Sequence, residues 1–201
     1  MKDSGVCSTL INSYSYHYDE LLCFSKLEKA LFSFTMEMNK DFSKDIIYLC
    51  IGTDRATGDC LGPLVGTRLK TLSPLAHIFG TLENPTHATN LVHTIDYIEK
   101  TFNKPLIIAV DASLGKADRI GFINVKRGGL KPGTALKKVL PEVGDFHISG
   151  VVNVAGFLEQ IVLQNTRLYT VYAMANIIAK SLHLANYRYE RFKRESIQVC
   201  K

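Results

Sequence analysis

Two runs of apolar residues, 46–51 and 106–110, dominate the hydrophobicity pattern of the chain. Neither run shows the alternation of apolar and polar residues that a half-exposed strand has, so both are predicted to be strands buried on both faces of a parallel sheet. The first leads through a glycine-rich loop to Asp59, and the second ends directly at Asp111. If the two strands are neighbours, their carboxyl ends bring both acids to the edge where open α/β sheets bind ligands.

Segments with helical spacing surround these strands. Residues 21–38, 61–72 and 91–101 carry apolar side chains every three or four positions, which predicts helices, and residues 76–82 are suited to a short strand. The alternation of strands and helices predicts a mainly parallel sheet with helices on both faces. We therefore expect an α/β fold, a three-layer α/β/α sandwich.

The second half of the chain completes the predicted sheet. Residues 119–126 alternate and lie too close to the preceding strand for a helical crossover, so they should pair antiparallel near an edge and make the sheet mixed. Helices are predicted for the segments 134–140, 151–163 and 168–189. A final parallel strand within residues 167–172 is the alternative to an uninterrupted last helix.

The chain is expected to fold as one domain with a short leading arm. Residues 1–20 are polar and are predicted to be a loosely ordered arm, although the alternation of Tyr14, Tyr16 and Tyr18 leaves a short strand as an alternative. Residues 21–201 are expected to form a single domain, because a chain of 201 residues suits one hydrophobic core.

The composition of the chain indicates which partners and which cellular compartment to expect. The net charge of +5 includes no long basic block, so a nucleic-acid partner is not expected. No apolar run is long enough to span a bilayer, so no membrane partner is expected either. The five cysteines are odd in number and have no metal-type spacing, and no signal peptide is evident, which favours the cytoplasm.

Asp59 and Asp111 are the candidate catalytic residues. Two carboxylates in direct contact share a proton and can act as acid and base on a water that attacks an amide. If His147 joins them instead, the three side chains would hold a divalent metal ion. His147 is predicted to lie in a loop, and its alternative role is that of a hydrogen-bonded surface residue.

Each candidate also has a structural interpretation. Asp59 stands just before a predicted helix and would serve as its N-cap, while Asp111 would shape the turn after its strand. Asp54 and Arg55 are expected to form a local ion pair that shapes the loop. Cys60 has no histidine beside it in sequence, which favours a packed thiol over a nucleophile.

Three segments resemble a known group of proteins. Residues 50–63 (CIGTDRATGDCLGP), 110–115 (VDASLG) and 149–154 (SGVVNV) are similar to those of the YyaC-like sporulation proteins of spore-forming bacteria. These in turn resemble the germination protease that degrades small acid-soluble spore proteins and, more distantly, the hydrogenase-maturation endopeptidases. The resemblance covers about residues 46–156.

The resemblance implies a phosphorylase/hydrolase-like sandwich and a peptidase. By position, Asp59 and Asp111 match the two acids of the germination protease and two acidic residues of the maturation enzymes, where the first binds metal. His147, with Gly150 three residues on, matches the His-x-x-Gly of the maturation enzymes. Asp54, Arg55 and His147 are thereby expected to support the two acids.

The resulting hypothesis is a sporulation-associated endopeptidase of the cytoplasm, in the forespore or spore core by resemblance. Its partner would be a protein or peptide substrate, with small acid-soluble spore proteins as the example, and no cofactor is expected. One alternative is a non-catalytic module that binds peptides or proteins on the same fold. The other is a metal-assisted maturation peptidase that uses Asp59, Asp111 and His147 around a divalent ion.

Overall fold

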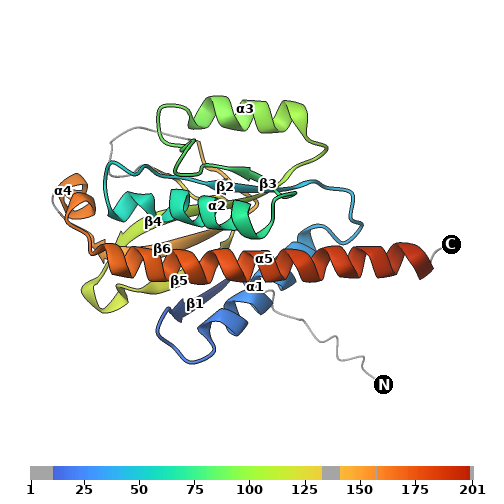
Figure 1. Ribbon diagram of the computed structural model, residues 1–201, viewed down its shortest axis with the longest axis horizontal. Coiled ribbons are helices and arrows are strands. Elements are labelled where there is room, and N and C mark those ends of the chain that lie inside the picture. Colours follow the sequence, from blue (N-terminus) through green and yellow to red (C-terminus); the bar gives the residue numbers. More distant parts are fainter. Residues whose placement is uncertain (1–10, 133–140, 157, 200–201) are drawn as a thin grey trace, which may run out of the picture.

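The computed structural model describes residues 11–132, 141–156 and 158–199, and it places a six-stranded sheet between two layers of helices (Figure 1). The strands are β1 (Ser13–His17), β2 (Ile46–Cys50), β3 (His77–Phe79), β4 (Leu106–Gly115), β5 (Phe122–Arg127) and β6 (Phe146–Val154). The α-helices are α1 (Cys23–Met38), α2 (Leu61–Leu72), α3 (Leu91–Thr101), α4 (Glu159–Gln164) and α5 (Leu168–Val199), and the short 3-10 helices are η1 (Gly58–Cys60) and η2 (Ala117–Arg119).

The sheet is mixed but mainly parallel. Its strand order is β1-β5-β6-β4-β2-β3, and β3, β2, β4 and β6 pair in parallel. Strand β5 is antiparallel to both of its neighbours, β6 and β1. The expected three-layer α/β/α fold is confirmed, as is the antiparallel strand close to an edge of the sheet.

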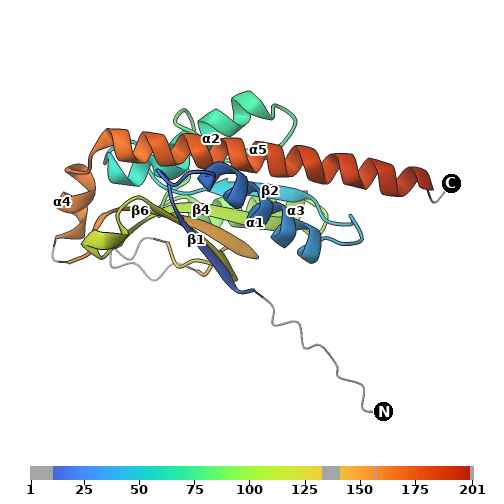
Figure 2. The ribbon, with the colours of Figure 1, turned by 90° about the horizontal axis from the view of Figure 1, so that it is seen from below.

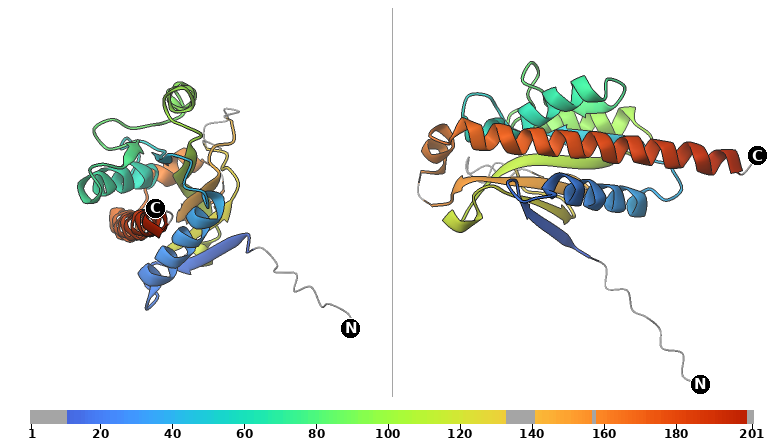
Figure 3. Two further views of the ribbon diagram at one scale, coloured as in Figure 1. Left: turned by 90° about the vertical axis from the view of Figure 1, so that its right-hand side faces the viewer. Right: turned by 60° about the horizontal axis from the view of Figure 1, so that its bottom comes forward.

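Helices cover both faces of the sheet, as the end-on view in Figure 3 shows. Helices α1, α2 and α5 pack on one face, against side chains such as Tyr48, Val110 and Ile148. Helix α3 packs on the other face, against Leu49 and Ala109. Because β2 and the first half of β4 contribute buried side chains to both faces, residues 46–51 and 106–110 form continuous apolar runs.

The leading segment contributes a strand that the sequence analysis assigned to a loose arm. Ser13–His17 form β1 and pair with Phe122–Lys126 of β5 along the edge of the sheet (Figure 2). Tyr14 and Tyr16 pack partly against the core from this strand, and the Tyr14 ring lies 5.4 Å from that of Phe34. The strand forms because one of its faces is apolar while the serines between the tyrosines stay at the surface.

Strand β6 is the main correction to the predicted elements. Residues 151–154 belong to this strand and not to the helix expected at 151–163, of which only α4 is formed. The strand considered within residues 167–172 is likewise absent, because α5 begins at Leu168. The helix predicted at 134–140 lies outside the described residues.

Among the described residues, none of the helices combines the length and the apolar character that a membrane span requires. Helix α5 is the longest, with 32 residues, but polar and charged residues recur along it.

Candidate active site

Strand β2, which leads through a loop to Asp59, lies beside strand β4, which carries Asp111, as the central inference from the sequence required. Cys50 at the end of β2 is paired with Val110 of β4, so Asp111 follows at the level where β2 stops. Strand β4 continues beyond this point and pairs there with β6, in which Ser149 is the partner of Asp111. Asp111 therefore projects from the middle of the sheet near its carboxyl edge, where it is buried.

The loop after β2 holds Asp59 by backbone hydrogen bonds. The Thr53 N–H donates to Asp59 Oδ2 at 2.9 Å and to the carbonyl oxygen of Asp59 at 3.2 Å. Gly52 has φ +138°, and a side chain there would lie 2.0 Å from the same carbonyl oxygen. A glycine at position 52 thus permits the close turn that brings Asp59 back to the end of β2.

A second glycine sets the position of the helix that follows Asp59. Gly62, at the start of α2, lies so close to β2 that a Cβ atom would be 2.0 Å from the carbonyl oxygen of Ile51. Asp59 lies in η1, which leads directly into α2. The contact between Gly62 and Ile51 therefore positions Asp59 relative to the sheet.

Asp59 and Asp111 line the same cavity, which has a volume of about 480 Å³. Its other lining residues come from β4, β5, β6, α4 and the segments next to residues 133–140; they are Ala112, Ser113, Leu114, Lys126, Gly129, Leu130, Lys131, Glu142, His147, Ser149, Glu159 and Leu163. The structure thus brings together the two acids that the sequence analysis selected.

Burial shifts both carboxyl groups toward the protonated form. The pKa of Asp111 is raised well above its usual value, chiefly by burial and then by the negative charge of Asp59. Burial also raises the pKa of Asp59, while the N–H of Thr53 and the charge of His87 oppose this shift. Asp59 thus has more groups that stabilise its ionised form, and Asp111 is the acid that keeps a proton more readily.

His147 lies at the same cavity but does not complete a metal site. It belongs to β6 and not to the predicted loop, and its Nδ1 is 2.8 Å from the carbonyl oxygen of Gly128. Within residues 11–132, 141–156 and 158–199, no three His, Cys, Asp or Glu side chains are placed to hold a metal ion. Asp111 also uses Oδ1 to accept the N–H of Ala112 at 2.8 Å. As placed here, the three expected ligands therefore do not fit a metal centre.

Asp54 and Arg55 lie outside the cavity. Both side chains are exposed, and the ion pairs of the described residues do not include one between them. The expected local ion pair is thus wrong; the turn is held instead by the Thr53 hydroxyl, which accepts the Arg55 N–H. Cys60 is buried beside Asp59, and burial raises the pKa of its thiol, as expected of a packed thiol rather than a nucleophile.

The cavity also contains polar residues that the sequence analysis did not select for this site. Ser149 lies beside Asp111 on the neighbouring strand β6, and Ser113 lies two residues after Asp111 on β4, where its hydroxyl donates to the carbonyl oxygen of Gly150 at 3.2 Å. Lys126 and Glu142 add charges of opposite sign at the cavity wall. The signal for Ser149 was the alternation of His147, Ile148 and Ser149, which is typical of a strand with one open face.

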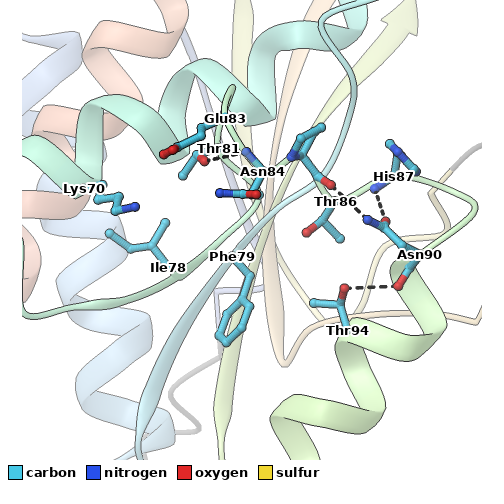
Figure 4. A pocket seen from close by; sticks show the side chains of 12 residues that line it. Lys70, Ile78, Phe79, Thr81, Glu83, Asn84, Thr86, His87, Asn90 and Thr94 are labelled. Carbon is cyan, nitrogen blue, oxygen red and sulfur yellow. Dashed lines mark hydrogen bonds between the residues drawn. The ribbon is translucent and has the colours of Figure 1, made fainter.

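A separate pocket of about 460 Å³ lies at the β3 edge of the sheet, and Figure 4 shows its lining. Its loop is held by Asn90, whose Nδ2 donates to the Pro85 carbonyl at 3.0 Å and whose Oδ1 accepts the His87 N–H at 2.8 Å. Neither Asp59 nor Asp111 lines this pocket. The candidate active site is therefore the cavity at the ends of β4 and β6.

Comparison with known proteins places the chain in a family. A family model described as "Protein of unknown function (DUF1256)" matches residues 15–181. The chain belongs to this family. A relative in Bacillus subtilis (strain 168), the uncharacterized protein YyaC, is 50% identical over 150 residues, which are 74% of this chain and 73% of YyaC. The match to YyaC agrees with the resemblance seen in residues 50–63, 110–115 and 149–154.

Among solved structures, the chain is similar to the [NiFe] hydrogenase maturation protease HycI from Thermococcus kodakarensis KOD1. The match has a TM-score of 0.39 and 19% sequence identity, and it covers 73% of this chain and 98% of that one. A likeness of this size carries no argument about the activity of the family. The function must therefore be argued from the site itself.

Proposed function

We propose that this protein is a peptidase in which Asp59 and Asp111 activate water against a peptide bond. The observation that carries the proposal is the placement of two carboxyl groups, Asp59 of η1 and Asp111 of β4, at one cavity, where burial raises the pKa of both. A pair of acids in a partly dry site shares a proton, and one member can then act as a base while the other acts as an acid.

The roles of the two acids follow from their surroundings. Asp59 is ionised and accepts a hydrogen bond from the Thr53 N–H. It takes a proton from the water while the oxygen of that water bonds to the carbonyl carbon of the substrate. Asp111, protonated, donates a hydrogen bond to the carbonyl oxygen, which gains negative charge in that step. When the C–N bond breaks, the proton on Asp59 passes to the leaving amine, and the products are a carboxyl group and an amine.

The proposed substrate is a protein with an accessible extended segment. The cavity lies at the carboxyl edge of the sheet, beside β6 and α4, and it is lined by polar groups that can bind backbone amides, such as Ser149 and His147. The sequence resemblance given above supplies the first substrate to test, a small acid-soluble spore protein, and with it the proposed role in sporulation.

Cleavage by purified protein, followed by intact-mass analysis, tests the proposal. The wild type should produce specific fragments, and Asp59→Asn and Asp111→Asn should each lower the rate by at least about 100-fold because a paired acid and base act as a unit. Asp96→Asn on the exposed side of α3 is the matched control and should cleave like the wild type.

Three outcomes would count against this mechanism. Cleavage that persists at the wild-type rate in both Asn variants would show that the acids do not carry the reaction. Loss of wild-type cleavage with a chelator and its return with a divalent ion would instead establish the metal-assisted alternative. If the substrate binds in a sedimentation assay but is not cut under any condition, the non-catalytic binding module replaces the peptidase.

A further inference from the structure

The outward face of α5 carries a stripe of exposed apolar side chains. The helix packs onto α1 and α2 through buried residues such as Ile178. On its opposite side, Tyr169, Tyr172, Leu184 and Tyr187 are 59%, 55%, 39% and 55% exposed. At 3.6 residues per turn these four side chains lie within one stripe along the helix axis. Within the described residues, then, a row of large apolar side chains is exposed along α5, the longest of the described helices.

The spacing of the stripe is symmetric about Ile178. Tyr169 and Tyr187 lie nine residues before and after this position, and Tyr172 and Leu184 lie six residues before and after it. Between these pairs the same stripe contains Asn176 and Lys180, two residues on either side of the centre. A surface that meets a second copy of itself across a two-fold axis must be self-complementary in this way, whereas a surface for an unrelated protein need not be.

We propose that α5 pairs antiparallel with α5 of a second copy of this chain, across a two-fold axis at the level of Ile178. In this arrangement Tyr169 of one protomer lies at the level of Tyr187 of the other, and Tyr172 lies at the level of Leu184. Lys180, which is the only charged side chain of the stripe between Tyr169 and Tyr187, lies beside an asparagine and not beside another charge.

The exposed apolar area of the stripe is at most about half of what one partner of a standard interface buries. An aromatic side chain can bury about 150–250 Å², so three half-exposed tyrosines and a leucine supply on the order of 300–400 Å² per protomer. A specific interface of standard size needs about 800 Å² per partner. The four side chains would thus form the apolar centre of an interface whose rim comes from polar residues of α5 and its neighbouring helices.

Sedimentation velocity over a range of concentrations tests the proposal on the full chain. The wild type should form a dimer, and the double variant Tyr172→Glu/Tyr187→Glu should raise its dissociation constant roughly 100-fold or more, because each change occurs twice in a two-fold interface. Glutamate is a good helix former, so the circular dichroism of α5 should stay unchanged. Tyr97→Glu on α3, where the tyrosine is 51% exposed, is the matched control and should leave the dimer intact.

Cysteine cross-linking tests the antiparallel register. In a background with Cys7→Ser and Cys200→Ser, a mixture of Tyr169→Cys and Tyr187→Cys proteins should form disulfide-linked dimers on mild oxidation. Either variant alone should not, because identical positions would lie about 27 Å apart along the helix axis at 1.5 Å per residue.

Three results would overturn the proposal. A wild type that stays monomeric at the highest concentration shows that α5 does not meet a second copy. A dimer that survives the double glutamate substitution uses another surface. Cross-linking of Tyr169→Cys to itself would mean that the two helices run parallel.

Discussion

The contact between Gly62 and β2 makes Gly62→Ala the most informative single change in this fold. A methyl group at position 62 would lie 2.0 Å from the carbonyl oxygen of Ile51 and 2.7 Å from its nitrogen. Both neighbours are backbone atoms, so no side-chain rotation relieves the overlap, and α2 must move away from the end of β2. A shift of about 1.5 Å or more is needed to restore an ordinary van der Waals contact.

The expected change in the free energy of unfolding of Gly62→Ala is the sum of two opposing effects. Overpacking against fixed atoms costs about 3 kcal/mol, at the upper end of the usual range. Replacing a glycine in a helix by alanine returns at most about 1 kcal/mol. The free energy of unfolding should therefore fall by about 2 kcal/mol. With a urea m-value of about 2 kcal/mol/M, the midpoint of unfolding should move down by about 1 M.

Urea unfolding followed by circular dichroism measures this change. Gly156→Ala is the control, because a Cβ at position 156 meets no atom within 4 Å, and its midpoint should match the wild type. If the proposed peptidase activity is found, Gly62→Ala should also lose about 100-fold in rate, since Asp59 moves with the start of α2. An unchanged urea midpoint for Gly62→Ala would refute the view that this contact sets the position of α2.

Two further predictions concern ionisable groups. The pKa of Asp111 is raised in the folded state, so between the usual pKa of an aspartate and the raised value the folded protein binds more protons than the unfolded chain. The free energy of unfolding should therefore fall as the pH rises through this range. Urea unfolding across this range should show a flatter pH dependence for Asp111→Asn, and a steeper one would contradict the assignment. Arg188 Nη1 lies 3.4 Å from Oε1 of buried Glu28, so Arg188→Ala should destabilise the protein by about 1–2 kcal/mol, an amount reduced because the arginine is half-exposed. Arg191→Ala, which breaks an exposed pair, should change the stability by less than about 0.5 kcal/mol, and equal losses in the two variants would refute the role of burial.

The parts of the fold that the sequence predicted correctly are those where one physical signal dominates. The runs at 46–51 and 106–110 are apolar throughout because helices cover both faces of β2 and β4. That pattern, with Asp111 directly at the end of its run, was enough to predict two buried strands, and it placed Asp59 and Asp111 at one edge of the sheet on the condition that the strands are neighbours, which the structure shows. The backbone contacts at Gly52 and Gly62 that position Asp59 depend on atoms distant in sequence and could only be seen in the structure.

The elements that the sequence analysis missed lie where signals compete. Strand β1 is an edge strand with one polar face, and its polar composition made a loose arm the prediction, although the alternation of its tyrosines left a short strand as the alternative. The hydrogen bond that holds His147 comes from a distant turn, and the lack of an ion pair between Asp54 and Arg55 depends on how that loop turns toward solvent. Neither outcome follows from the local residues alone.

In strand β6, the polar residues that led to a wrong secondary-structure prediction are also residues of the candidate site. A strand in the middle of a sheet is normally apolar on both faces, but β6 alternates, with Phe146 and Ile148 buried and with His147 and Ser149 half-buried. Among the described residues, His147 and Ser149 on this half-buried side of β6 line the cavity that also contains Asp111. The polar positions that made β6 look like a loop in the sequence are therefore the same positions that line the cavity beside the two acids. In an α/β chain, an alternating segment that must fit between apolar strands is itself an indication of where the site lies.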